Sequence, residues 1–127
     1  MKDQRKKILV VDDEEDLTYF LKANLEIEEN YEVFIVTRAK DAFKSALKYK
    51  PDLIILDIMM PQVDGIEILE KIKNSKNTLD IPVIILSAKI DDATKIKAAK
   101  LYVECYITKP VQIEELKEKI KEVFLHY

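Results

Sequence analysis

The sequence predicts an α/β fold in which helices cover both faces of a five-stranded parallel sheet, a doubly wound architecture. Three short runs rich in Ile and Val, each bounded by polar residues, have the composition of strands buried on both faces: residues 8–11, 53–56 and 83–86. Segments with helical periodicity separate them. Strand and helix alternate five times along the chain, which indicates parallel strands joined by right-handed crossovers.

Two weaker strands are predicted at residues 32–36 and 105–107. Apolar residues that recur at helical spacing predict five helices, over residues 16–28, 40–49, 65–74, 91–101 and 113–125. Pro51 is expected to end the second helix, and Asp16 is expected to be the N-cap of the first. Asp64 and Gly65 are expected to form the turn that opens the third helix.

Length and composition fit a single domain over residues 1–127, with a core from about residue 7 to residue 125. A chain of 127 residues, of which 48% are apolar, can bury a core without disulfides or a structural metal. Its only cysteine, Cys105, excludes a disulfide framework and a thiolate zinc site, as expected of a protein of the reducing cytoplasm.

The composition also excludes several classes of function. Basic and acidic residues number 21 and 24, and this balance argues against nucleic-acid binding by the domain. The single glycine, Gly65, excludes dinucleotide-binding folds and P-loops, which need several. The apolar runs are too short for a membrane span, and the basic start leads into only four apolar residues, so neither a membrane segment nor a signal peptide is predicted.

Polar side chains follow the predicted strands, and in a parallel sheet the carboxyl ends of the strands share one edge. These residues are Asp12, Asp13, Glu14, Asp57, Ser87, Thr108 and Lys109. Carboxylates held close together repel one another and either take up protons or bind a cation. A site of oxygen ligands suits Mg²⁺ or Mn²⁺ better than zinc, which prefers His or Cys. A hydroxyl and an ammonium beside such a metal are suited to a phosphoryl group.

Taken singly, these residues also have structural explanations. An acidic residue after a strand is often a helix N-cap, and Ser87 is compatible with a cap or a turn. Tyr106 is compatible with core packing, and Lys109 is one of many lysines. For Asp12 and Asp13 a shared site is favoured, because two adjacent acids are not needed for one cap and Asp57 is expected across the crevice.

Four segments carry a family resemblance, in order and at family spacing: ILVVDDE at 8–14, LDIMMPQVDG at 56–65, ILSA at 85–88 and YITKP at 106–110. From about residue 7 onward the chain resembles the receiver domain of two-component response regulators, of the chemotaxis-Y-like type. The resemblance implies a flavodoxin-like (βα)5 fold with strand order 2-1-3-4-5. It also implies a regulatory phosphoacceptor that catalyses only its own phosphorylation and dephosphorylation, rather than a classical enzyme.

The resemblance implies a role for each matched residue of the acidic group. Asp57 would accept a phosphoryl group from a phosphohistidine on a sensor histidine kinase or a phosphotransfer protein. Mg²⁺ would be held by Asp13, Asp57 and the backbone carbonyl of Met59, with Asp12 contributing through water. Because cations must offset the repulsion between a carboxylate and a phosphoryl group, this arrangement is chemically consistent.

The resemblance also implies how phosphorylation is transmitted. Ser87 and Lys109 would contact the phosphoryl oxygens, and a cis bond before Pro110 would direct Lys109 into the pocket. In the family, the hydroxyl at the position of Ser87 then moves toward the phosphoryl group and the ring at the position of Tyr106 turns inward. This changes the surface of the fourth helix, fifth strand and fifth helix, which would act on a downstream protein target. The kinase is expected to dock near the first helix and the loop after the fifth strand.

One departure from the family pattern, at Tyr102, and two positions within the pattern carry expectations of their own. Tyr102 stands where the family usually has Gly, and a Tyr resists a left-handed helix C-cap, so we expect the fourth helix to be longer or differently turned. Met59 and Lys89 occupy positions that tune the lifetime of the acyl phosphate. An apolar Met59 cannot orient a hydrolytic water, so we expect slow to moderate autodephosphorylation.

Other functions are compatible with parts of the pattern. A pseudo-receiver that binds partners without phosphorylation is the main alternative, although the presence of Asp57, Asp13, Ser87 and Lys109 argues against it. A phosphatase of the haloacid dehalogenase type needs a second Asp where this chain has Met59. The sequence leaves open whether the receiver stands alone or belongs to a longer regulator.

Overall fold

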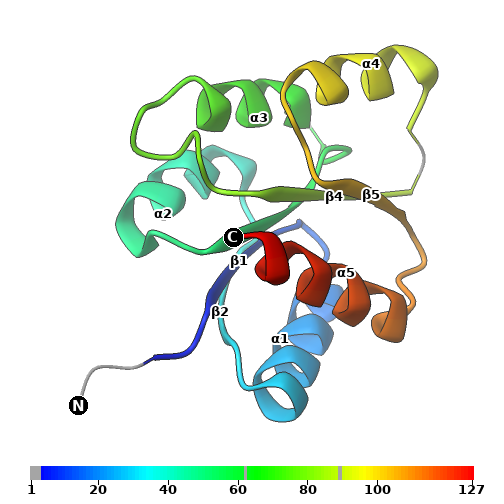
Figure 1. Cartoon of the computed structure of the whole chain (residues 1–127). Helices are drawn as coiled ribbons and strands as arrows, with labels where there is room; N and C mark the ends of the chain where they lie inside the picture. Colours follow the sequence, from blue (N-terminus) through cyan, green and yellow to red (C-terminus); the bar gives the residue numbers. More distant parts are fainter. Residues whose placement is uncertain (1–3, 62, 89) are drawn as a thin grey trace.

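Five parallel strands form one sheet in the order β2-β1-β3-β4-β5, in a computed structural model that describes residues 4–61, 63–88 and 90–127 (Figure 1). The strands are β1 (Lys7–Val11), β2 (Glu32–Val36), β3 (Leu53–Asp57), β4 (Val83–Ser87) and β5 (Cys105–Thr108). The helices are α1 (Glu15–Glu29), α2 (Ala42–Tyr49), α3 (Gly65–Lys73), α4 (Asp92–Lys100) and α5 (Ile113–His126), with a 3₁₀ turn at Ala39–Asp41. The predicted α/β class and strand order are confirmed.

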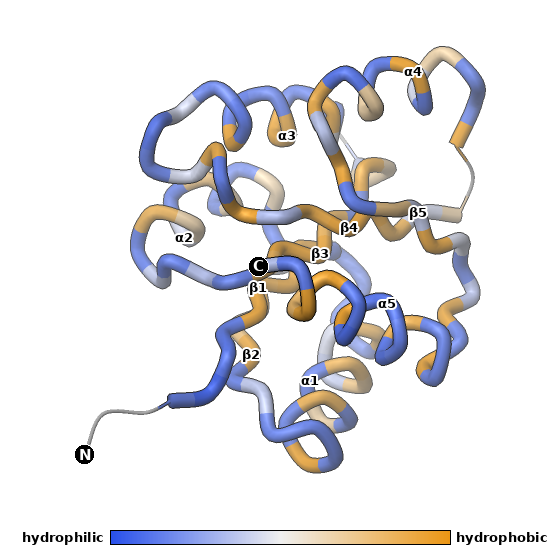
Figure 2. The backbone as a smooth tube through the Cα atoms, in the orientation of Figure 1, coloured by the Kyte–Doolittle hydropathy of each residue, from blue (hydrophilic) through white to orange (hydrophobic). Residues whose placement is uncertain are grey.

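Alternate residues of the central strands face two separate hydrophobic cores. Leu9, Ile54 and Ile85 face one core, which α2, α3 and α4 cover, whereas Ile8 and Ile55 face the other, which α1 and α5 cover. Figure 1 shows these two groups of helices on opposite sides of the sheet. In Figure 2 the central strands are mostly hydrophobic, while the helices mix hydrophobic and hydrophilic residues. The strands are continuously apolar because both of their faces are covered, and the helices alternate apolar and polar residues because only one face of each helix packs against the sheet.

Burial explains why some strands were easier to predict than others. All five residues of β3 and of β4 are buried, and these central strands read as continuous apolar runs. The edge strands β2 and β5 are only partly buried and carry mixed sequences. A strand is easiest to recognise in a sequence where helices cover both faces of the sheet, because all of its residues are then apolar.

The start of α3 agrees with the sequence prediction, whereas the starts of α1 and α2 differ from it. Asp64 and Gly65 open α3 as predicted, and Asp64 is its N-cap: its side chain accepts a hydrogen bond of 2.9 Å from the backbone N–H of Ile66. The prediction that Asp16 caps the first helix is wrong: Glu14 is the N-cap and Asp16 lies inside the first turn. The predicted helix 40–49 begins later, because the 3₁₀ turn comes before α2.

Gly65 is required by close packing rather than by an unusual backbone angle. It begins α3, and its N–H donates to the carbonyl of Ile58 at 3.2 Å. A Cβ atom at this position would lie 2.2 Å from the Cα of Ile58. The start of α3 therefore lies directly against the residue that follows Asp57 in the chain.

The end of α4 differs from the expectation drawn from Tyr102. The helix ends at Lys100, and Tyr102 adopts the left-handed conformation with φ 60° that a glycine would adopt. Its N–H donates to the carbonyl of Ala99 at 3.1 Å, and 82% of the residue is exposed. Exposure removes any clash of the ring with the core, but the contact between Cβ and the backbone remains, at a cost of about 1–2 kcal/mol.

Replacing Tyr102 with glycine should therefore stabilise the domain. We expect Tyr102→Gly to raise the free energy of unfolding by about 1 kcal/mol, because glycine adopts positive φ without steric cost. Urea unfolding of both proteins measures the difference. Tyr102→Ala is the matched control, since it removes the same ring but keeps the Cβ, and equal gains in both variants would contradict this explanation.

Candidate functional site

The carboxyl ends of the strands place the predicted site residues along one edge of the sheet. Asp12 directly follows β1, and Asp57 and Ser87 are the last residues of β3 and β4. Ser87 pairs in register with Thr108, the last residue of β5, and Lys109 follows it. The parallel register thus brings residues far apart in sequence to one place, as predicted.

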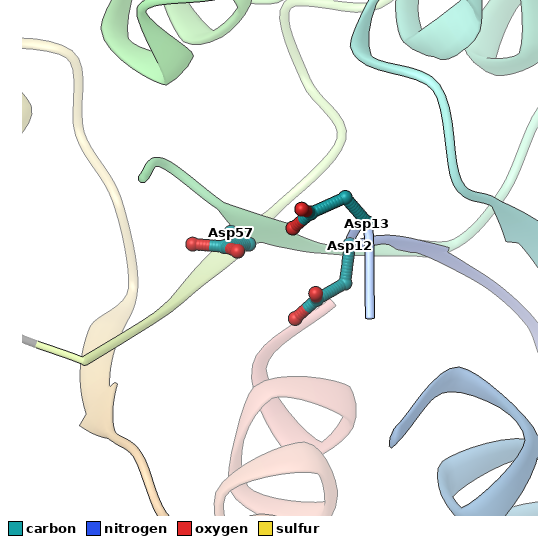
Figure 3. A group of neighbouring side chains, drawn as sticks. All are labelled: Asp12, Asp13 and Asp57. Carbon is teal, nitrogen blue, oxygen red and sulfur yellow. The ribbon is translucent and has the colours of Figure 1, made fainter. Parts of the chain in front are cut away.

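Three carboxyl groups gather where β1 and β3 end. One oxygen from each of Asp12, Asp13 and Asp57 lies within 4.8 Å of the others, and Figure 3 shows the three side chains together. Asp12 and Asp57 are buried, whereas Asp13 is exposed. The group therefore has a buried base and one side open to solvent.

Lys109 is the cation at the centre of these acids. Its Nζ lies 2.6 Å from Glu14 Oε1, 2.9 Å from Asp12 Oδ2 and 3.2 Å from Asp57 Oδ2. Burial lowers the pKa of Lys109, but the hydrogen bond to Glu14 and the nearby carboxylates of Asp12 and Asp57 outweigh that effect and raise it. The ammonium therefore stays charged. The peptide bond between Lys109 and Pro110 is cis, as expected.

Asp12 has the features of a ligand without a complete set of partners. Its Oδ1 accepts a hydrogen bond of 2.9 Å from the N–H of Glu14. Its Oδ2 is buried and makes no well-directed hydrogen bond, although the charge of Lys109 lies close by. Burial raises the pKa of Asp12, against the opposing effects of the Glu14 N–H and Lys109. A divalent cation, or a water molecule bound to one, would give this oxygen a partner, so the acidic group fits the predicted metal.

The carboxylate of Asp57 is held from two sides. Its Oδ1 accepts a hydrogen bond of 2.9 Å from the N–H of Met59, and its Oδ2 faces Lys109. This bond keeps the backbone of Met59 beside the acid, while 56% of the Met59 residue is exposed. The group most suited to nucleophilic attack is therefore fixed in orientation, and an apolar side chain lies next to it.

The two proposed switch residues lie on neighbouring strands. Ser87 is fully buried, and its carbonyl accepts the N–H of Lys109 at 2.8 Å. Tyr106 is half-buried in β5, and its hydroxyl donates to the carbonyl of Lys95 in α4 at 3.0 Å. Tyr106 thus connects the strand next to Ser87 with a surface helix. Lys89, the other position expected to tune lifetime, lies outside the described residues.

Two contacts of the site were not predicted from sequence. The sequence places Glu14 at the same edge but gives it no role, whereas its carboxylate is the one nearest to Lys109. The amide of Met59 also bonds to Asp57, where only its carbonyl was expected to act. The first contact depends on side-chain rotamers and the second on the local direction of the backbone, neither of which the residue pattern contains.

Comparison with known proteins agrees with this geometry. Residues 8–121 match the response regulator receiver domain family. The chain belongs to this family. It is a signalling module of two-component systems rather than a classical enzyme, and its acidic group is typical of a receiver Mg²⁺ site. Membership implies a partner histidine kinase.

Curated relatives support the same assignment. The chain is 39% identical over 118 residues to the alkaline phosphatase synthesis transcriptional regulatory protein PhoP of Bacillus subtilis, covering 93% of this chain and 48% of PhoP. It is 40% identical over 115 residues to the response regulator ArlR of Staphylococcus saprophyticus, covering 91% of this chain and 50% of ArlR. The chain thus spans about half the length of these relatives.

Solved structures agree at the level of fold. A CheY-like receiver domain from Methanospirillum hungatei superposes with a TM-score of 0.87 at 31% identity, covering 94% of this chain and 93% of that one. The chemotaxis protein CheY4 of Vibrio cholerae has a TM-score of 0.86 at 24% identity, covering 94% of this chain and 98% of that one.

Among the described residues, no helix is both long enough and apolar enough to cross a bilayer.

The raised pKa of Asp12 predicts how stability depends on pH. Below the ordinary pKa of 3.8 the group is protonated in both the folded and the unfolded chain. As pH rises above 3.8, the unfolded chain loses this proton first, so Asp12 reduces stability progressively until its folded pKa is passed. We expect Asp12→Asn to raise the melting temperature by a few degrees at neutral pH without metal, and to have little effect below pH 3.8.

Thermal unfolding at several pH values in the presence of a chelator measures this effect. Asp16→Asn is the matched control, because Asp16 is exposed in the first turn of α1. A gain that does not change with pH would contradict burial of the charge as its cause.

Proposed function

We propose that the domain is a phosphoacceptor switch that takes a phosphoryl group from a phosphohistidine onto Asp57. The observation that carries this proposal is the buried Asp57 carboxylate, which the Met59 N–H and Lys109 hold beside Asp12 and Asp13. A carboxylate in this setting is oriented, and a cation already faces it. Membership of the receiver family supports the same role.

In the proposed transfer, a carboxylate oxygen of Asp57 forms a bond to phosphorus while the bond between phosphorus and the histidine nitrogen breaks. The imidazole keeps the electron pair of that bond and takes up a proton from solvent. Lys109 lies 3.2 Å from Asp57 Oδ2 and is placed to hydrogen-bond to an oxygen of the transferred group. Its ammonium offsets the charge that otherwise repels two anions.

Asp13, Asp57 and the backbone carbonyl of Met59 would hold Mg²⁺, with Asp12 contributing through water, and Mn²⁺ would fit the same oxygen ligands. A divalent ion there would neutralise phosphoryl oxygens during transfer. The incompletely bonded Oδ2 of Asp12 and the absence of His or Cys from this group support a hard cation.

The response would pass from Ser87 to the α4-β5-α5 surface. We infer that the Ser87 hydroxyl moves to the phosphoryl group and that Tyr106 turns into the space it leaves. This rotation of the ring would break the hydrogen bond from the Tyr106 hydroxyl to the carbonyl of Lys95, and it would thus change the contacts of α4. A coupling of about 1–3 kcal/mol is typical of such two-state devices.

Partners and location follow from the same proposal. A sensor histidine kinase or phosphotransfer protein would supply the phosphoryl group, docking near α1 and the loop after β5, and a protein target would read the changed surface in the cytoplasm. Nucleic acid and membrane are not proposed as partners of this domain. Its relatives PhoP and ArlR are about twice as long, so whether residues 1–127 act alone is part of the hypothesis.

Chemical phosphorylation tests the proposal. Incubation with Mg²⁺ and acetyl phosphate should add about 80 Da, the mass of one phosphoryl group, and Asp57→Asn should abolish the addition. Intact-protein mass spectrometry measures it, with Asp16→Asn as a matched control that should be labelled like wild type. Failure of wild type to respond to acetyl phosphate or to beryllofluoride with Mg²⁺ would favour the pseudo-receiver alternative.

Met59 provides a second prediction, on the lifetime of the phosphorylated state. Its side chain is apolar and exposed next to Asp57, so it offers no hydrogen bond to an attacking water. We expect a half-life of minutes or longer in the purified protein, and we expect Met59→Asn to shorten it because an amide can bind water. Loss of label after removal of the phosphodonor measures the lifetime, with Met59→Leu as the apolar control. A half-life of seconds in wild type would refute the expectation.

A further inference from the structure

The carboxylate nearest to Lys109 does not belong to any of the three clustered aspartates. Glu14 Oε1 lies 2.6 Å from Lys109 Nζ, compared with 3.2 Å for Asp57 Oδ2. Glu14 occupies the N-cap position of α1, yet its side chain makes no capping bond. Ser, Thr, Asp and Asn are the residues that cap helices well. The longer side chain of Glu14 does not cap α1 and instead contacts Lys109, the residue that follows β5.

The hydrogen-bonding capacity of Lys109 makes this contact consequential. An ammonium group has three N–H donors, and three carboxylates surround this one: Asp12, Glu14 and Asp57. A phosphoryl group on Asp57 would compete with these carboxylates for the ammonium, and turning Lys109 toward it would weaken the contacts that hold Lys109 elsewhere.

Burial decides which contact gives way. The side chain of Glu14 is 58% exposed, whereas those of Asp12 and Asp57 are 0% and 3% exposed. Water can replace Lys109 around an exposed carboxylate at little cost, but not around a buried one. The contact with Glu14 is therefore the least costly to break.

Charge acts in the same direction. Phosphorylation replaces one negative charge on Asp57 with about two, by analogy with phosphoserine. The Glu14 carboxylate faces the same ammonium at 2.6 Å and so lies close to the incoming charge. Glu14 thus competes for Lys109 before transfer and repels the phosphoryl group after it.

We propose that Glu14 is a latch: a positioning residue that holds Lys109 in the unphosphorylated state and slows phosphorylation of Asp57. This inference rests on the proposed phosphoacceptor function. Removing the charge of Glu14 should leave Lys109 free to bind the phosphoryl group earlier. We expect the rate of phosphorylation to rise about two- to fivefold, the range that a partly exposed ion pair allows.

The test compares variants in the full chain with Mg²⁺ and acetyl phosphate, following the mass increase with time. Glu14→Gln removes the charge, and Glu14→Asp keeps the charge on a side chain that is one methylene shorter, which lengthens the contact with Lys109. Glu15→Gln is the matched control, because Glu15 is an exposed acid in the first turn of α1. NMR of the Lys109 ammonium in each unphosphorylated variant reports whether its hydrogen bond to Glu14 is lost.

Faster labelling of both Glu14 variants, with Glu15→Gln equal to wild type, supports the latch. Rates for Glu14→Gln equal to or below wild type overturn it, as does equal acceleration by Glu15→Gln, which would indicate a general effect of net charge. If wild type itself takes up no phosphoryl group, the proposed function fails and the latch fails with it; if only the variants fail to differ, the latch alone fails.

Discussion

Four carboxylates crowd the carboxyl edge of the sheet, and positive charge has to offset their repulsion. Lys109 supplies that charge, with contacts of 2.6–3.2 Å to three of them: Asp12, Glu14 and Asp57. The arrangement is held by the strands from which these residues extend, since the last four residues of β1 and all of β3 are buried. A tightly packed sheet thus keeps together charges that would otherwise move apart.

Because the sheet has a core on each face, different helices lie next to the two parts of the proposed switch. α1, which has Glu14 as its N-cap, and α5 cover one face of the sheet, whereas α2, α3 and α4 cover the other. The hydroxyl of Tyr106 binds the carbonyl of Lys95 and so ties β5 to α4 on that second side. β5 therefore lies between the two: Lys109 follows this strand at the site, and Tyr106 within it is bonded to α4.

Much of the fold could be predicted because periodicity and burial determine it directly. Central strands such as β3 are buried along their whole length, and the edge on which Asp12 and Asp57 meet follows from parallel topology. Details that depend on a single rotamer or backbone angle could not be predicted. Asp16 was expected to cap α1, but Glu14 takes that position and turns its side chain to Lys109.

Gly65, the chain's one glycine, joins α3 to the segment that follows Asp57. Its N–H bonds to the carbonyl of Ile58, and the Cα of Ile58 occupies the space that a Cβ would need. Every other amino acid carries a Cβ, so no replacement at this position avoids the collision. We therefore expect this position to tolerate substitution poorly although it has no side chain, because α3 packs directly against the segment that follows Asp57.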